Sequence, residues 1–254
     1  MLLAIDIGNT QIAAGIFNND NLKAHWRIST LVSRTEDETW VLLQSISSAF
    51  GFKLTDVTGV AISSVVPNVT AAFEKLSVKY LQLKPLIISY QIKTGLVIQY
   101  VNPANVGADR ICNAIAGYEK FGGPLIIVDF GTATTFDIIS KKREYLGGII
   151  APGIEMSSMI LHQKAAKLPW VELSFPEKVI GYSTETSMQS GLLYGTVEMV
   201  KGFVNKINLE LGQEAKIIIT GGLAKLVLQK LGKNFILEQF LTLEGLKIIF
   251  DKVK

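Results

Sequence analysis

Apolar runs alternate with short polar turns along the whole chain, and one such turn is unusually rich in chemistry. Residues 125–128 are apolar, Asp129 follows, and a turn through Gly131 and Thr132 leads into a second β-rich run. This pattern predicts a buried strand, a tight turn and a returning strand. Because glycine has no Cβ, the turn could admit a phosphate close to its backbone. A hairpin with a merely polar tip remains an alternative for a single turn.

The N-terminus repeats this design. Asp6 follows a run of apolar residues, and Gly8 and Asn9 come next at the spacing of the glycine and threonine in the later turn. Two turns of the type acidic–glycine–polar, one opening each half of the chain, indicate a duplicated unit with a ligand between its copies.

Helical and extended segments alternate around these turns. Thr35 and Glu38 have the spacing of a capping box, which predicts a helix that stops at Gly51. Further helices are predicted at residues 69–81, after 107, at 188–204 and at 223–231, and further strands at 22–29, 57–66, 145–151 and 217–220. This order predicts an α/β protein with mixed sheets. We expect two halves, residues 1–115 and residues 116–254.

Composition narrows the function classes. A hydrophobic content of 48% with 19% charged residues supports a substantial core and argues against disorder. The net charge of +3 comes with scattered lysines, so we expect no nucleic-acid partner. The single Cys112 excludes an intramolecular disulfide, and with only His25 and His162 beside it there is no zinc constellation. No apolar stretch reaches about 18 residues, so we expect a soluble cytoplasmic protein without a membrane span.

Several common motifs are missing. The chain has no P-loop, no dinucleotide fingerprint after a strand and no G-x-S-x-G nucleophile elbow. The two turns therefore remain as candidate ligand sites, together with a strand, the pair Gly221-Gly222 and a helix. A strand, a glycine pair and a helix N-terminus form a generic anion site, although glycine pairs also close ordinary loops.

This combination resembles the actin and sugar-kinase superfamily, whose two halves clamp ATP between such turns. Within it the chain resembles the type III pantothenate kinases. The resemblance rests on blocks in family order: Asp6–Thr10, Gly107–Arg110, Asp129–Ala133, Gly147–Gly153, Leu168-Pro169, Thr184, Gln189–Gly191 and Thr220–Gly222. It implies a duplicated actin-like (ribonuclease H-like) α/β fold, with two mixed-sheet halves around a nucleotide cleft.

The resemblance also implies an activity, which is the ATP-dependent phosphorylation of pantothenate as the first step of coenzyme A biosynthesis. ATP, with Mg²⁺, would be held by Asp6, Ile7, Gly8, Asn9, Thr10, Gln11, Ile12, Ala13 and Thr132. Of these, Gln11, Ile12 and Ala13 are expected to contribute backbone contacts only. Pantothenate would be held by Tyr100, Gly107, Ala108, Asp109, Arg110 and Thr184. Asp109 would also accept the proton, and Asp129 would hold a monovalent cation, potassium or ammonium.

Elementary physics agrees with these roles. Asp109 near a helix N-terminus should stay ionised, because the helix dipole stabilises its carboxylate. The guanidinium of Arg110 suits the carboxylate that pantothenate carries. The implied partner is a second copy of the chain, in a homodimer that completes the pantothenate pocket across its interface. Thr184 would contribute from the other subunit, and Gly191 and Gly195 would permit close helix packing; the alternative is that Thr184 only caps its helix.

Two other functions stay open. One is a different small-molecule kinase of the same superfamily. The other is a non-enzymatic transcriptional regulator built on this fold. Loss of Asp6, Asp109 or Asp129 would have favoured the regulator, and all three are present.

Overall fold

The computed structural model describes all 254 residues and divides them into two compact units. Unit 1 comprises Met1–Glu119 and Phe240–Lys254, and unit 2 comprises Lys120–Gln239. The sequence predicted a division after residue 115 with the whole C-terminal segment in the second half. The structure instead returns the C-terminal helix to unit 1, where its apolar face is buried.

Unit 1 is built on a five-stranded mixed sheet in the order β3-β2-β1-β4-β5. Its strands are β1 (Leu2–Ile7), β2 (Gln11–Asn18), β3 (Asn21–Ser29), β4 (Gly59–Ser64) and β5 (Leu86–Ile87). The short strand β6 (Val97–Ile98) is also in this part of the chain but does not belong to this sheet. Its helices are α1 (Glu36–Ala49), α2 (Pro67–Leu81), α3 (Ala108–Phe121), α7 (Leu241–Val253) and the 3₁₀ turns η1 (Leu54–Asp56) and η2 (Pro103–Asn105). Strand β1 pairs antiparallel with β2 and parallel with β4.

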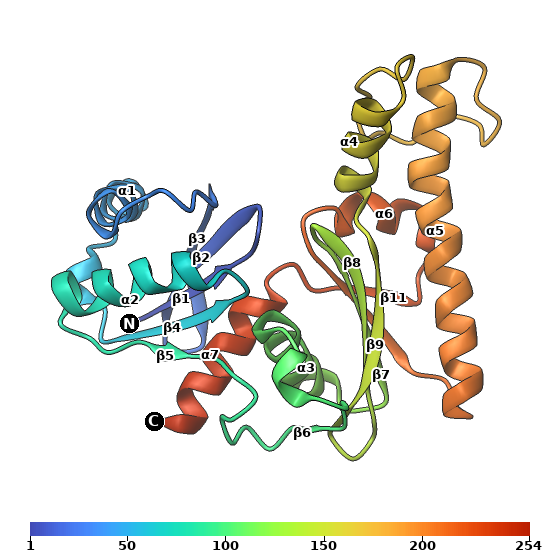
Figure 1. Cartoon of the computed structure of the whole chain (residues 1–254). Helices are drawn as coiled ribbons and strands as arrows, with labels where there is room; N and C mark the ends of the chain where they lie inside the picture. Colours follow the sequence, from blue (N-terminus) through green and yellow to red (C-terminus); the bar gives the residue numbers. More distant parts are fainter. The chain divides into compact units, whose positions relative to one another are not determined.

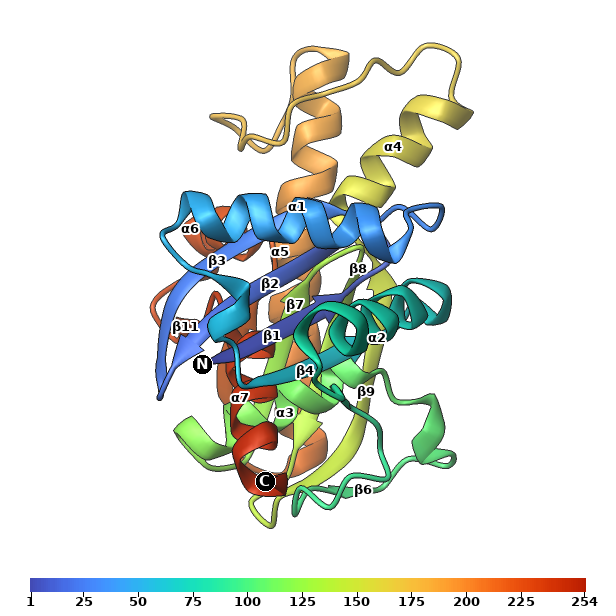
Figure 2. The ribbon, with the colours of Figure 1, turned by 90° about the vertical axis from the view of Figure 1, so that its left-hand side faces the viewer.

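Helices cover both faces of this sheet. On one face, α1 and α2 pack over Leu3 and Ile5 of β1 with their own Leu43 and Phe73, and Figure 2 views the unit from this side. Helix α1 begins as predicted, because Thr35 and Glu38 form a reciprocal capping box.

The other face of the sheet is covered by α7. Leu246 and Ile249 of α7 are fully buried, and the helix contacts β1, β2 and β4 (Figure 1). A Cβ added at Gly245 would lie 2.2 Å from the carbonyl oxygen of Cys112 in α3. The close approach of these two helices therefore needs glycine at that position.

Unit 2 repeats the sheet of unit 1. Its strands are β7 (Leu125–Phe130), β8 (Ala133–Ile139), β9 (Glu144–Pro152), β10 (Lys216–Thr220) and β11 (Phe235–Leu237), in the order β11-β10-β7-β8-β9. Strand β7 is antiparallel to β8 and parallel to β10, as β1 is to β2 and β4. In both β1 and β7 the first four residues are buried, the fifth is half-buried and the sixth is buried. The fifth residues are Asp6 and Asp129, so the predicted duplication is confirmed at the level of single residues.

The helices of unit 2 are α4 (Ile154–Lys164), α5 (Thr184–Leu211) and α6 (Ala224–Leu231). Helix α5 has 28 residues, which corresponds to a length of about 42 Å. Helix α4 and the first part of α5 extend beyond the ends of the strands (Figure 1). Despite its length, α5 is too polar to qualify as a membrane-spanning segment, and no other helix qualifies either.

Candidate functional site

The turn after β1 exposes polar side chains above a buried strand. Asn9, Thr10 and Gln11 are exposed, and the N–H of Gly8 donates to the carbonyl of Gln11 at 3.0 Å. The hydroxyl of Thr30 donates to the carbonyl of Gly8 at 2.7 Å. Thr30 therefore fixes this turn, a contribution that no local sequence signal reveals.

Some turn residues can take part only through their backbone. The side chains of Ile7 and Ile12 lie in the core, with 0% and 2% of their surfaces exposed. Ala13 pairs with Asp6 across the hairpin. Side-chain chemistry at this turn is thus confined to Asp6 and the exposed polar residues.

The start of α3 places a second carboxylate in unit 1. The carbonyl of Gly107 accepts from the N–H of Ile111 at 3.1 Å, which closes the first helical turn. Asp109 is half-buried, and its Oδ1 accepts from the N–H of Arg110 at 2.8 Å. The side chain of Arg110 itself is buried. Tyr100 is half-buried and lies just before η2.

Burial dominates the electrostatics of Asp109. The surrounding protein removes water from its carboxylate and raises its pKa above the ordinary value, although the N–H and guanidinium of Arg110 oppose this shift. The sequence led us to expect the helix dipole to dominate and favour the charged form. That expectation was wrong about the dominant effect, which is burial. Local sequence does not show that the first turn of α3 is buried.

Asp6 and Asp109 share an environment in unit 1. Burial, and then the negative charges of Asp6 and Asp109, raise the pKa of the Cys112 thiol well above its ordinary value. Both carboxylates therefore lie close enough to the thiol to interact with it electrostatically. Cys112 is fully buried and stays protonated, so it is a core residue and no nucleophile, as predicted.

The turn after β7 is enclosed by backbone. Gly131 and Thr132 are exposed, but a Cβ added at Gly153 would lie 2.2 Å from the Thr132 carbonyl oxygen. On the other side, a Cβ at Gly221 would lie 2.4 Å from Oδ1 of Asp129, and Gly221 has a φ of +96°. Two glycines far apart in sequence thus hold this turn between them.

Gly131, in contrast to Gly153 and Gly221, has room for a side chain. A Cβ at this position would find its nearest atoms at 3.6 Å, which is ordinary van der Waals contact, and its φ is not positive. The folded chain alone does not need a glycine at this position. A methyl group would fit at this position, so the bare backbone leaves that much room for a ligand to approach it.

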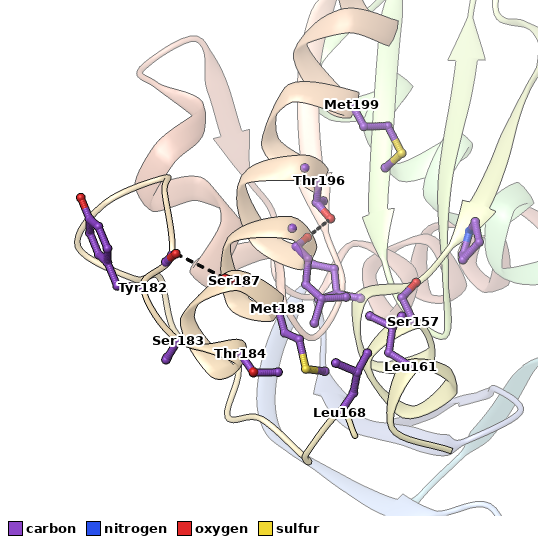
Figure 3. A pocket seen from close by; sticks show the side chains of 16 residues that line it. Ser157, Leu161, Leu168, Tyr182, Ser183, Thr184, Ser187, Met188, Thr196 and Met199 are labelled. Carbon is purple, nitrogen blue, oxygen red and sulfur yellow. Dashed lines mark hydrogen bonds between the residues drawn. The ribbon is translucent and has the colours of Figure 1, made fainter. Parts of the chain in front are cut away.

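Thr184 is one of the residues that line a pocket in unit 2. The pocket has a volume of about 1000 Å³ and is lined by Ser157 and Leu161 of α4 and by Thr184, Met188 and Thr196 of α5, among others (Figure 3). The helix is capped by Ser183, whose side chain accepts from the N–H of Thr186. The alternative that Thr184 merely caps α5 is therefore wrong.

Gly191 and Gly195 also line this pocket, and a Cβ at either position would meet no atom within 4 Å. Nothing within the chain packs against these two glycines, although Leu192 and Leu193 between them are buried in the core of unit 2. The small side chains thus leave an open strip on the helix.

No protein-built metal cage is present. The structure contains no group of three or more His, Cys, Asp and Glu side chains that could hold a metal ion. A cation at Asp129 would need its remaining ligands from backbone carbonyls, water or a bound phosphate compound.

Comparison with known proteins supports one family. Residues 2–206 match the family model described as type III pantothenate kinase. A protein of Geobacillus kaustophilus (strain HTA426), named type III pantothenate kinase, is 46% identical over 252 residues, which cover 99% of this chain and 98% of that protein. A protein of Geobacillus sp. (strain WCH70) with the same name shows the same identity and coverage.

Solved structures with low identity share the fold. The activator of 2-hydroxyisocaproyl-CoA dehydratase from Clostridium difficile, with bound ADPNP, superimposes with a TM-score of 0.58 at 14% identity, covering 99% of this chain and 95% of that one. A Campylobacter jejuni protein described as a proposed Baf family transcriptional activator gives 0.59 at 20% identity, with 98% of both chains covered. These neighbours establish the actin-like ATPase fold that the sequence predicted.

Proposed function

The chain belongs to the type III pantothenate kinase family, and we propose that it transfers a phosphoryl group from ATP to pantothenate in the first step of coenzyme A biosynthesis. The observation that carries this conclusion is the identity of 46% over 99% of the chain to a relative of that name. A match of this extent includes both carboxylate turns and the start of α3.

We propose that the nucleotide is bound by the turn from Asp6 to Ala13 in unit 1 and by Thr132 in unit 2. The exposed amide and hydroxyl groups of Asn9 and Thr10 can donate to phosphate oxygens. Gly131 is exposed and has no side chain, so an anion can approach the backbone of this turn. ATP enters as its Mg²⁺ complex, as is general for kinases.

Asp109 is the proposed proton acceptor for the primary hydroxyl of pantothenate. Phosphoryl transfer through a loose transition state requires positioning more than base strength, so a carboxylate that takes the proton late is sufficient. Its raised pKa brings it closer to the working pH than an exposed aspartate. Tyr100, Gly107, Ala108 and Arg110 are the proposed substrate contacts in the same unit, Arg110 pairing with the substrate carboxylate.

Asp129 is the proposed ligand of a monovalent cation, potassium or ammonium. The carboxylate is half-buried at a strand end and lies against Gly221, whose missing side chain leaves room beside Oδ1. A bound cation would offset the repulsion between the nucleotide phosphates and the acidic substrate. We place the reaction in the cytoplasm, where ATP is available.

We further propose a homodimer in which the pantothenate pocket is completed by the partner. The open strip at Gly191 and Gly195 can receive a second helix across a two-fold axis, since neither glycine meets an atom of its own chain within 4 Å. Exposed apolar side chains at Ile180 and Tyr182 lie just before α5 and favour burial. Thr184 would then reach the substrate of the other subunit.

The reaction is tested by coupling ADP formation to a spectroscopic readout, with and without pantothenate, in potassium and then in sodium. We expect ADP formation only with pantothenate. Asp109→Asn should lower turnover by a factor on the order of 10² or more, with little change in the Michaelis constant for ATP. ADP formation that ignores pantothenate would point to another phosphotransferase, and no turnover with any acceptor would point to a regulator.

The shared pocket is tested by mixing two inactive variants, Asp109→Asn and Thr184→Val. In a mixed dimer with shared pockets, one site contains both substitutions and the other site contains neither, so activity returns. If each site is built within one subunit, every site keeps one lesion. A mixture that stays inactive after demonstrated subunit exchange would contradict the shared pocket.

A further inference from the structure

The geometry at the start of α3 points to a role for Gly107 that goes beyond a backbone contact with substrate. We propose that Gly107 is a positioning residue, and that its missing side chain leaves the space in which the Asp109 carboxylate is held. The inference rests on the proposed function of Asp109 as proton acceptor. It concerns what places that group, and it assigns to Gly107 no contact with the reacting atoms.

The space over Gly107 is filled by one atom. A Cβ added at Gly107 would lie 2.4 Å from Oδ1 of Asp109, whereas the next nearest atoms, Cγ of Asp109 and Cγ1 of Val65, lie at 3.5 Å. The backbone of Gly107 does not have a positive φ. An alanine could therefore adopt this backbone conformation, and the single obstacle to it is the carboxylate.

Two glycines of unit 2 cannot be replaced for a different reason. At Gly153 an added Cβ would lie 2.2 Å from the Thr132 carbonyl oxygen, and at Gly221 it would lie 2.6 Å from the Phe130 backbone as well as 2.4 Å from Oδ1 of Asp129. Backbone atoms cannot rotate away. At Gly107 the obstructing atom is the end of a side chain that can rotate. An alanine at Gly153 or Gly221 should therefore disrupt the fold, whereas an alanine at Gly107 should only displace the side chain of Asp109.

The position that Asp109 would leave is a defined one. Its Oδ1 accepts the N–H of Arg110 at 2.8 Å, within the first turn of α3. An N–H at a helix start favours an anion at this place, and the surrounding protein keeps water away from the carboxylate. With alanine at position 107, Oδ1 must rotate out of this space, lose that hydrogen bond and become more solvated.

The test begins with Gly107→Ala in the pantothenate assay. A misplaced catalytic group costs up to about 10²-fold in rate, so we expect kcat to fall between about tenfold and a hundredfold. The Michaelis constant for ATP should be unchanged, because the proposed nucleotide contacts lie at the two turns. Gly202→Ala is the matched control, since an added Cβ there meets nothing within 4 Å; it should keep full kcat.

A double-mutant cycle then separates positioning from direct action. If Gly107 acts through Asp109, then Gly107→Ala should cost nothing further in the Asp109→Asn background. An equal loss in both backgrounds would overturn the proposal, as would a kcat within twofold of wild type. A Gly107→Ala protein that fails to fold would overturn it too, because the structure predicts displacement of a side chain only.

One readout does not depend on the substrate. Crystal structures of the wild type and of Gly107→Ala at the same pH should show the Asp109 carboxylate against the Arg110 N–H in the first and rotated away in the second. If the wild-type enzyme does not use pantothenate, the proposed function fails while this comparison still decides the positioning role. An unmoved Asp109 in the variant would overturn the inference.

Discussion

The turn after β1 and the turn after β7 begin alike and are stabilised differently. Each follows a strand with the same burial pattern, and each has its aspartate as the one half-buried residue. The turn of unit 1 is held from outside by Thr30, whose hydroxyl donates to the Gly8 carbonyl and whose backbone N–H donates to the Thr10 carbonyl at 3.0 Å. The turn of unit 2 is held on two sides by the backbones of Gly153 and Gly221, which approach so closely that no side chain fits.

This difference indicates which kind of contact each turn can offer. Around Asp6 the exposed groups are side chains, so a ligand there meets amides and hydroxyls that can adjust. Around Asp129 the exposed groups are the bare backbone at Gly131 and the residue Thr132, on a turn that Gly153 and Gly221 approach closely. A duplicated scaffold has thus kept the carboxylate in both copies, while one copy became adaptable and the other preorganised.

The largest expected effect comes from filling the enclosed turn. Gly221→Ala would place a Cβ about 2.4 Å from Asp129 and 2.6 Å from the Phe130 backbone, at a φ of +96°, and should cost on the order of 4 kcal/mol or more. Gly131→Ala is the matched control, because its Cβ has room; it should keep the fold and raise the Michaelis constant for ATP. Thermal unfolding and ATP kinetics of the two variants check this, and equal melting temperatures would contradict it.

A smaller but specific effect is expected from the two turn aspartates. Asp129→Asn should abolish the advantage of potassium over sodium, which we expect to be at least about tenfold, or about 1.4 kcal/mol of transition-state stabilisation. Asp6→Asn should lower the rate in both salts while leaving their ratio intact. Rates measured at matched ionic strength decide the matter, and a preserved potassium preference in Asp129→Asn would rule out the proposed ligand.

Local patterns in the sequence were sufficient for much of the fold. The alternation of apolar and polar residues predicted both hairpins, and the capping box at Thr35 predicted the start of α1; both are confirmed. These features depend on residues within one strand or one helical turn, where sequence spacing translates directly into geometry. Helix α5 is longer than its predicted core of residues 188–204, because polar residues extend both ends.

Features that join distant segments were not predictable. Nothing in the sequence of α7 says which sheet its apolar face will cover, and the structure places it against β1 rather than in unit 2. Thr30 lies far along the chain from the turn it fixes, and Gly153 and Gly221 approach their turn from separate loops. The dominant effect of burial on Asp109 likewise depends on tertiary packing that spacing does not encode.

The hydroxyl that holds the turn of unit 1 should have a modest and separable effect. Thr30→Val removes its hydrogen bond to the Gly8 carbonyl and should cost about 1 kcal/mol of folding stability. It should also raise the Michaelis constant for ATP, since the turn loses one of the two hydrogen bonds that Thr30 donates to it; the bond from the Thr30 backbone N–H to the Thr10 carbonyl remains. Thr58→Val is the control, because Thr58 donates to the carbonyl of Met1 away from the turn. An unchanged ATP constant in Thr30→Val would show that the turn needs no such support.

The smallest expected effect concerns the stability that Asp109 costs the fold. Because burial raises its folded-state pKa above the ordinary 3.8, the folded protein binds this proton more tightly than the unfolded chain. The charged carboxylate therefore lowers stability above the folded pKa, and the cost disappears as the pH falls through that value. Asp109→Asn should raise the melting temperature at pH near 7 while removing activity, and the gain should shrink on acidification. Asp56→Asn removes one negative charge at an exposed position and is the control for the change in net charge. A melting temperature lowered by Asp109→Asn at neutral pH would mean that the hydrogen bond to the Arg110 N–H outweighs the burial of the charge.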